Sequence, residues 1–301
     1  MTTSNGNLEK ALGEGKFVIT AETSPPDSAD PQAVLDRAGC LKGVADAVNV
    51  TDGAGARSHM SAFAATVVLA QAGIEPVLQF TTRDRNRLAL QGDLIGAGTF
   101  GIPNILCLNG DDVKGGDQPE TKPVHDLDSR SLMATARQMR DEGTLPSGRE
   151  LKPPPRLFIG GAEVPRQPDE KFNTDGITAK IEAGCHFFQT QFAYDMDVLK
   201  AYMGRLRDEG ITERAYFIIG CGPLASAKSA RWMTENLFGV HVPDPVIKRL
   251  EGADDQRAEG KKICVELMQE MAEVDGIHGV HLMGPRVEEA VAEVVEESGL
   301  R

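Results

Sequence analysis

Short apolar segments of strand length recur along this chain at nearly constant intervals. The first four begin at residues 17, 46, 75 and 104, so each starts 29 residues after the one before. Later segments begin at 156, 186 and 215, again 29 or 30 residues apart. This interval holds one strand and the crossover helix that a parallel neighbour needs. We therefore predict eight βα units, with strands over 17–22, 46–51, 75–80, 104–110, 156–162, 186–191, 215–221 and 279–284.

The intervals between these segments have the composition of helices. Most carry apolar residues at helical spacing and end at a glycine, which is favoured just after a helix. Eight such strands, each followed by a helix, indicate an α/β fold of the (β/α)8 TIM barrel type. A doubly wound sheet usually has a glycine-rich first turn, but the first turn here reads ETSPPDSADP. We expect one barrel domain over residues 1–301, with a longer interval between strands seven and eight that holds two or three helices, so at least one is extra.

Charge and composition argue against several classes of partner. The chain has 301 residues, is 41% hydrophobic and carries a net charge of −13, so we expect no nucleic-acid partner. No apolar run reaches the ~20 residues needed to span a bilayer, and the first ten residues lack the pattern of a secretory signal. The five cysteines and six histidines show no metal-binding spacing. We expect a cytoplasmic protein without a metal site or a membrane-spanning segment. The sequence is compatible with a monomer and with a homo-oligomer.

Polar side chains follow the ends of the predicted strands. Because active sites of this barrel lie at the C-terminal ends of the strands, such residues are candidates for chemistry. One polar residue alone is usually a helix cap or a solvated loop position, but six strand ends in register favour a shared site. The residues are Glu22, Thr51, Asp52, Gln79, Thr81, Arg83, Asn109, Gly110, Asp111, Glu163, Gln189 and Gln191.

Two of these carboxylates, Glu22 and Asp111, suit acid–base chemistry. Glu22 follows an apolar strand and precedes Pro25-Pro26, so it is the better candidate to hold a proton near neutral pH. Gln191 offers a donor and an acceptor, which suit the amide edge of a heterocycle. No serine or cysteine lies in a nucleophile-elbow or papain-like context. The demanding step is therefore expected to belong to a bound cofactor.

Seven longer strings carry a resemblance to a known family. In the family's order they are GKFVITAETSPP, ADAVNVTDGAGA, RDRNRLALQGDLIGAG, NILCLNGDD, KPVHDLDS, KIEAGCHFFQTQFAYD and GCGPLASAKSARWM. On these strings the chain resembles the methylenetetrahydrofolate reductases, specifically the type of the catalytic subunit of acetogenic bacteria. The resemblance runs from about residue 8 to 299, and strings of this length are more specific than a single glycine motif.

The resemblance implies a barrel that holds FAD at the C-terminal ends of its strands. Hydride would pass between a nicotinamide nucleotide and the one-carbon unit of tetrahydrofolate, interconverting the methylene and 5-methyl forms. The family's general acid falls on Glu22, a second catalytic and folate-contacting carboxylate on Asp111, and further folate contacts on Gln191 and Arg286. The expected FAD contacts are Thr51, Ala54, Gln79, Asn109, Gly110, Leu127 and Lys180.

Several positions depart from the family's pattern. Asn109 and Ala179 stand where many family members have an arginine. Gly161 stands in place of a tyrosine and Pro165 in place of a histidine. Ala227 stands in place of an aromatic residue that clamps substrate or nicotinamide. FAD binding through Arg83 and Arg85 is therefore an alternative, as is electron delivery by a partner protein instead of NADH. Two other functions on this barrel also stay open: a methyltetrahydrofolate-dependent methyltransferase and a non-catalytic folate-binding subunit.

Overall fold

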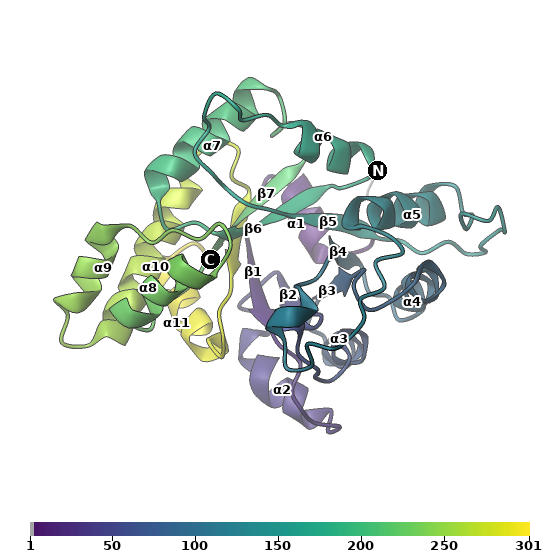
Figure 1. Cartoon of the computed structure of the whole chain (residues 1–301), viewed down its shortest axis with the longest axis horizontal. Coiled ribbons are helices and arrows are strands. Elements are labelled where there is room, and N and C mark those ends of the chain that lie inside the picture. The colour runs from purple at the N-terminus through teal and green to yellow at the C-terminus, as the bar shows by residue number, and fades with distance from the viewer. Residues whose placement is uncertain (1–2) are drawn as a thin grey trace.

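The computed structural model describes residues 3–301 and has a closed barrel of parallel strands at its centre (Figure 1). The strands pair in chain order, and β8 closes the ring against β1. The predicted (β/α)8 barrel is confirmed, and so is each of its eight strands. They are β1 (Val18–Thr23), β2 (Ala47–Val50), β3 (Pro76–Thr81), β4 (Asn104–Leu108), β5 (Phe158–Glu163), β6 (Phe187–Phe192), β7 (Tyr216–Cys221) and β8 (Gly279–Leu282).

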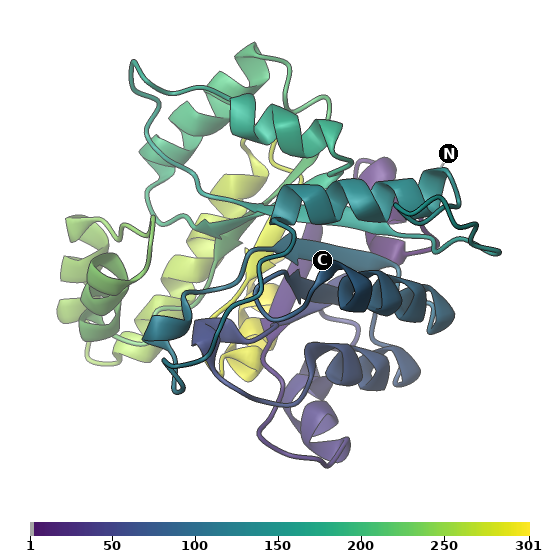
Figure 2. The same cartoon turned by 45° about the vertical axis from the view of Figure 1, so that its right-hand side comes forward.

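Helices surround the barrel and connect successive strands (Figure 2). Three of them, α8, α9 and α10, lie between β7 and β8, where two or three were expected. Within residues 3–301 no helix is both long enough and apolar enough to cross a membrane. The helices are α1 (Asn7–Gly13), α2 (Gln32–Ala38), α3 (Ala62–Gln71), α4 (Arg87–Thr99), α5 (Ser129–Asp141), α6 (Asp175–Glu182), α7 (Met196–Asp208), α8 (Ala227–Asn236), α9 (Asp244–Glu251), α10 (Gln256–Ala272) and α11 (Glu288–Ser298), with short 3-10 turns η1 (Gly39–Leu41), η2 (Ala54–Ala56) and η3 (Val113–Gly115).

Several helices start at caps that the sequence supplies locally. At α4, the side chain of Asn86 accepts hydrogen bonds from the amides of Leu88 and Ala89. At α5, Asp128 and Ser131 each accept a hydrogen bond from the backbone amide of the other, in a capping box. Such caps satisfy amides that have no partner inside the helix. They fix where the loops at the barrel mouth end and the helices begin.

Residues of each strand alternate between the barrel interior and the surrounding helices. In β1, Val18 packs inside the barrel, whereas Ile19 joins the larger core beneath the helices. Helix α1, purple beside the N label in Figure 2, packs Leu8 and Leu12 against the interior at the N-terminal end of the barrel. The interior layer there consists of Val18, Ala47, Val77, Leu106, Phe158, Phe187 and Ile218. The predicted site residues lie at the opposite end.

Two residues further along the strands the barrel interior becomes polar, at Gln79 on β3, which is 8% exposed, and at four more deeply buried positions. Thr20, Asn49, Gln189 and His281 lie there, and none is more than 3% exposed. Barrel interiors of this type are usually filled by bulky branched apolar side chains. The polar layer therefore marks the part of the barrel directly below the predicted site.

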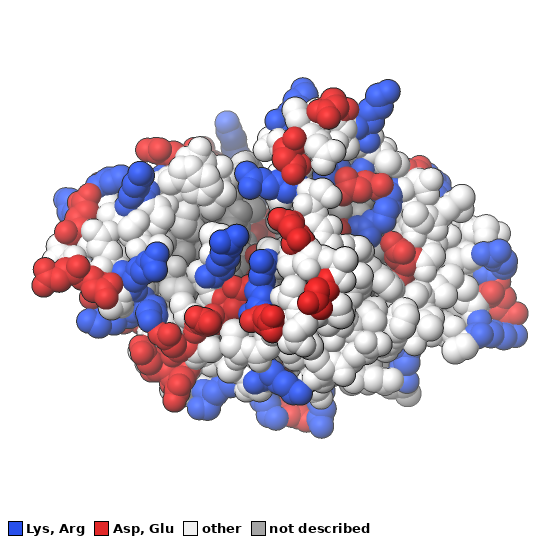
Figure 3. All heavy atoms as spheres, turned by 90° about the horizontal axis from the view of Figure 1, so that it is seen from below, with Lys and Arg blue, Asp and Glu red and all other residues white. Residues whose placement is uncertain are grey.

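The outer surface carries charges of both signs. In the face seen in Figure 3, acidic and basic side chains are intermixed around a recess, and neither sign covers the face. A face of mixed charge lacks the single-sign positive field that guides a polyanion.

Candidate active site

Glu22 stands near the end of β1 with one carboxylate oxygen held in place. Gln79 on β3 donates a hydrogen bond from Nε2 to Glu22 Oε2 at 2.8 Å. His281 on β8 places its Nε2 3.7 Å from the same oxygen. Among the described residues none donates to the other oxygen, Oε1, and the side chain is 21% exposed. Glu22 is therefore positioned by the barrel but still accessible to a ligand.

A hydrogen-bonded polar layer lies directly beneath Glu22. Asn49 and Gln189 bond reciprocally through their amides, at 2.6 and 2.9 Å. Gln189 Nε2 also lies 3.0 Å from Thr20 Oγ1, and that oxygen lies 2.9 Å from His281 Nδ1. Each of these four residues comes from a different strand, so the layer ties β1, β2, β6 and β8 together across the interior.

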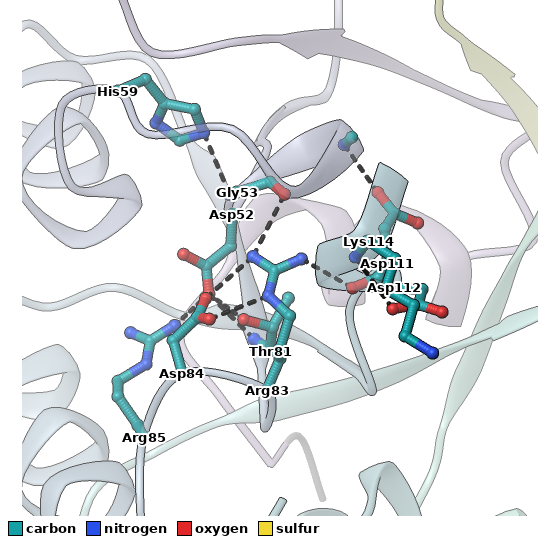
Figure 4. A network of polar contacts seen from close by, with 11 residues as sticks. Asp52, Gly53, His59, Thr81, Arg83, Asp84, Arg85, Asp111, Asp112 and Lys114 are labelled. Carbon is teal, nitrogen blue, oxygen red and sulfur yellow. Dashed lines mark hydrogen bonds and ion pairs between the residues drawn. The ribbon is translucent and has the colours of Figure 1, made fainter. Parts of the chain in front are cut away.

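Asp111, three residues beyond the end of β4, is held against the loop that follows β2. Its Oδ2 accepts a hydrogen bond from the amide of Gly55 at 2.6 Å. Arg83 lies between the two loops, as Figure 4 shows, and donates to the carbonyls of Asp111 at 3.1 Å and Gly53 at 3.2 Å. Arg83 is 3% exposed, and its hydrogen bonds hold the pKa of Asp84 below the usual value. Arg83 thus connects the loop after β2 with the loop after β4 through hydrogen bonds.

Arg85 is also engaged by the protein itself. It pairs with Asp52 and with Asp93, and its guanidinium lies 4.7 Å from the centre of the Phe80 ring. Asp52 Oδ2 additionally accepts from the amide and the hydroxyl of Thr81, both at 2.9 Å (Figure 4). The alternative that Arg83 and Arg85 bind a cofactor phosphate would require both arginines to leave carboxylates of the protein.

A cavity of about 460 Å³ lies beside Asp111. It brings together five of the predicted site residues, Arg83, Asn109, Gly110, Asp111 and Leu127, and neither Glu22 nor Gln191 lines it. Asn109 Oδ1 accepts from the amide at the start of α5, at 2.8 Å. The β4 end therefore forms a site of its own beside the barrel interior.

The remaining predicted cofactor contacts lie apart from this cavity. Thr51 is buried, and its hydroxyl bonds to Ser24 at 3.0 Å. Ala54 is exposed at the start of η2. Lys180 on α6 donates to the carbonyl of Ala162 at 2.7 Å and pairs with Glu163 at 3.2 Å. The positive charge of Lys180 is thus balanced by a carboxylate of the same chain.

Gln191 lies within the register shift of β6, between Gln189 and Phe192, and is tied to a surface loop. Its Nε2 donates to the carbonyl of Phe238 at 3.3 Å, and its Oε1 accepts from the amide of Phe192 at 3.0 Å. Arg286 is exposed before α11, with φ of +56°, and lines a separate cavity of about 480 Å³. Both predicted folate contacts therefore lie at the C-terminal ends of strands, but in different surroundings from Asp111.

Two departures from the family pattern have structural explanations. A Cβ atom at Gly161 would lie 2.6 Å from the terminal methyl of Met133 on α5, so a side chain at this position would point toward the helix layer and away from the mouth. Ala227 is 6% exposed at the start of α8, and its amide donates to Gln256 at 2.9 Å. Neither position presents an aromatic ring to the mouth.

His281 and Asn49 were not singled out from the sequence. Both lie in apolar strand segments, where a single polar residue is easily interpreted as part of the hydrophobic core. The signal that would have found them is the alternation of period two, which puts Thr20, Asn49, Gln189 and His281 on inward-facing positions. Within residues 3–301, the structure groups no three His, Cys, Asp or Glu side chains that could hold a metal ion.

Comparison with known proteins gives the family. The family model described as methylenetetrahydrofolate reductase matches residues 7–299. Methylenetetrahydrofolate reductases 1 and 2 of Schizosaccharomyces pombe are 25% and 26% identical to this chain, over 84% and 82% of its length. A probable methylenetetrahydrofolate reductase (NADPH) of Caenorhabditis elegans is 24% identical over 78% of the chain. The matches cover 40%, 39% and 34% of those relatives, so the chain spans about two fifths of their length or less.

A solved structure shares the fold. An uncharacterized protein from Clostridium thermocellum, which binds two copies of 5-methyl-5,6,7,8-tetrahydrofolic acid, superimposes with a TM-score of 0.62 at 17% sequence identity. The likeness covers 96% of this chain and 98% of that protein. Since the family model covers nearly the whole chain, the protein belongs to the methylenetetrahydrofolate reductase family.

Proposed function

We propose that this protein is a flavin-dependent oxidoreductase that interconverts 5,10-methylenetetrahydrofolate and 5-methyltetrahydrofolate. The observation that carries the proposal is the setting of Glu22, with Oε2 held by Gln79 and Oε1 free of donors in the described chain. A carboxylate held in this way can transfer a proton at a defined point. The names of the curated relatives, and the folate bound by the Clostridium thermocellum protein, support the same substrate class.

We assign the ring system of FAD to the cavity at the end of β4, whose lining includes Asn109, Gly110, Asp111 and Leu127. Asn109 uses its Oδ1 for Ser129 and keeps an amide N–H₂ for a ligand, while Gly110, with φ of +89°, adds no side chain. The residues that would hold FAD are Thr51, Ala54, Gln79, Asn109, Gly110, Leu127 and Lys180. When bound, FAD would supply the hydride that reduces the one-carbon unit.

The phosphate end of the cofactor has weaker support. Lys180 would reach a pyrophosphate only by giving up its contacts with Glu163 and Ala162. Exchanging an internal ion pair for a ligand contact returns little free energy. We therefore expect FAD to bind weakly and to be lost during purification unless it is added.

Glu22 acts on the nitrogen that leaves the one-carbon unit. In the reducing direction the bond between this nitrogen and the carbon breaks, and the nitrogen takes a proton from Glu22 Oε1. The carbon, now an iminium, accepts the hydride and becomes a methyl group. Gln79 keeps Oε2 turned away so that the protonated oxygen faces the substrate. In the oxidising direction Glu22 takes the proton back.

Asp111 and Gln191 orient the folate. Asp111 keeps one oxygen on Gly55 and has the other for a pterin N–H. Gln191 has an amide donor and acceptor that now bond to Phe238 and Phe192, and folate would exchange with these contacts. Arg286, exposed two residues before the last helix, suits the carboxylates of the folate tail.

The electron source and the location complete the proposal. The buried Ala227 offers no ring for stacking a nicotinamide, which favours a partner protein over NADH as the electron donor. We place the enzyme in the cytoplasm, where reduced folates and such donors would meet it.

The proposal is tested with protein purified anaerobically and supplied with FAD. We expect flavin absorbance to stay with the protein, and menadione to drive oxidation of 5-methyltetrahydrofolate. Absence of both flavin binding and folate oxidation would contradict the proposal. Methyl loss that needs no flavin, and occurs only with a corrinoid or thiol acceptor, would instead identify a methyltransferase.

A further inference from the structure

A line of hydrogen bonds crosses the barrel interior below Glu22 and ends at His281. Its members, Thr20, Asn49, Gln189 and His281, are at most 3% exposed. We propose that His281 is a positioning residue that presents an N–H group to Glu22, and that the other three set its tautomer. The inference rests on the proposed role of Glu22 as general acid.

The direction of the line starts from the orientation of the Gln189 amide. Gln189 pairs reciprocally with Asn49, accepting from Asn49 Nδ2 at 2.6 Å and donating to Asn49 Oδ1 at 2.9 Å. The atom of Gln189 that reaches Thr20 Oγ1, at 3.0 Å, is Nε2, which is a donor. The hydroxyl of Thr20 is therefore an acceptor toward Gln189.

Thr20 passes this direction on to His281. Its own proton has two acceptors in reach, His281 Nδ1 at 2.9 Å and the carbonyl of Val280 at 3.5 Å. The shorter contact has the geometry of a good hydrogen bond, and the longer one is at the limit. Nδ1 is then an acceptor, so a neutral imidazole carries its proton on Nε2.

Nε2 of His281 faces the carboxylate of Glu22. It lies 3.7 Å from Oε2, the oxygen that Gln79 also contacts. A shift of about 0.5 Å would bring this pair within hydrogen-bond distance. An N–H group at this point stabilises the carboxylate that remains once Glu22 has given up its proton. Oε1 stays available for the substrate.

Packing alone does not account for this layer. Buried hydroxyls and amides gain little net free energy over apolar side chains of the same shape, and the interior layer at the other end of the barrel is apolar. Here each polar residue contacts the next, and the line ends at the proposed general acid. Glu22 and His281 are the titratable pair at this point, since Gln79 and Thr20 are neutral.

The tautomer can be measured without cofactor or substrate. In protein with ¹⁵N-labelled histidine, the ring signals of His281 are identified by their loss in His281→Gln. We expect the Nε2–H form near pH 7.5, and a mixture of both tautomers in Thr20→Val, which removes the hydroxyl. An Nδ1–H form in the wild-type protein would overturn the inference.

The kinetic test compares two substitutions of His281 in the FAD-supplied enzyme. His281→Leu removes the donor, and we expect kcat for 5-methyltetrahydrofolate oxidation to fall about 10-fold, with folate KM changed by less than about twofold. His281→Gln keeps an N–H group and should restore most of kcat. In the leucine variant the pH profile should shift upward by about one unit, since the carboxylate has lost a donor.

His278, the residue just before β8, gives a matched control at the N-terminal end of that strand. It accepts from the amide of Phe217 at 3.1 Å, and His278→Gln should keep kcat and the pH profile. If His281→Leu had the kcat and the pH profile of the wild-type enzyme, the inference would be overturned. A wild-type protein without any folate turnover would contradict the proposed function, while the tautomer measurement would still decide the orientation of His281.

Discussion

Gln79 and Glu22 meet at 2.8 Å inside the barrel mouth, although 57 residues separate them in the sequence. They belong to β3 and β1, which are not neighbours in the barrel because β2 lies between them. The contact therefore crosses the interior, and the barrel orients the carboxylate. A carboxylate on a loop would lack this restraint.

Replacing Glu22 by glutamine tests the acid directly. Glu22→Gln keeps the size and the contact with Gln79 but has no acidic proton, so folate turnover should fall by a factor of about 10²–10⁴. FAD binding should be unchanged in the same preparation. Glu182→Gln, at an exposed position ending α6, should behave as wild type. Substantial turnover in Glu22→Gln would remove the general-acid assignment.

Asp111→Asn tests the electrostatic role of the β4 end. Asparagine still has an oxygen to accept from Gly55, so the loop should keep its position. Loss of the negative charge should raise the reduction potential of bound flavin and weaken folate binding about 10-fold, which corresponds to ~1.4 kcal/mol. Spectroelectrochemistry and folate titration measure the two effects. Asp117→Asn, at an exposed position in the same loop, is the control. If the flavin potential and the folate Kd of Asp111→Asn equal those of Asp117→Asn, Asp111 lies outside the site.

Gln191→Glu tests the folate contact on β6. The carboxylate cannot donate to the carbonyl of Phe238, and it offers no donor to a pterin. Folate Kd should rise about 10-fold to 100-fold, whereas FAD Kd should stay within about twofold. Equal losses for folate and FAD would mean that the substitution disturbs the barrel mouth as a whole.

His186 makes the fold sensitive to acid. Burial, with a further contribution from Arg140, lowers the pKa of His186 from 6.5 to about 4. The folded protein keeps this imidazole neutral, so its contribution to stability is complete above pH 6.5 and is lost as pH falls toward 4. The loss in the free energy of unfolding should approach ~3 kcal/mol, measured by urea unfolding.

A substitution isolates this effect. His186→Asn has no titrating ring, and its Oδ1 can still accept from the amide of Ile159, which now contacts Nδ1 at 3.3 Å. This variant should show a smaller loss of stability between pH 6.5 and 4 than wild type. His241→Asn, at an exposed position, should lose as much as wild type. The same pH dependence in all three proteins would contradict the account of His186.

The fold could be predicted because its signal is local and repeated. A strand and a helix of nearly fixed length set the spacing, and the hydrophobic runs mark each strand. The position of Glu22 and of Asn109 to Asp111 at strand ends follows from the same pattern. Helix α1, which closes the N-terminal end of the barrel, was not predicted, because its contacts are with residues far along the chain.

Side-chain partners could not be predicted to the same extent. Arg83 follows a strand, where a cation suggests an anionic ligand, but Asp84, Gly53 and Asp111 enclose it. Lys180 has the same ambiguity, since Glu163 from another element neutralises it. Such pairings depend on distances across the mouth, and no local sequence pattern specifies them.

The central claim is that Glu22 serves a flavin-dependent reaction of the folate one-carbon unit. The most direct measurement is an anaerobic titration of the protein with FAD, followed by 5-methyltetrahydrofolate, with the flavin absorbance recorded. We predict that the folate bleaches bound flavin in the wild-type protein and leaves it oxidised in Glu22→Gln. Bound flavin that stays oxidised in the wild-type protein, or bleaches equally in both, would contradict the account.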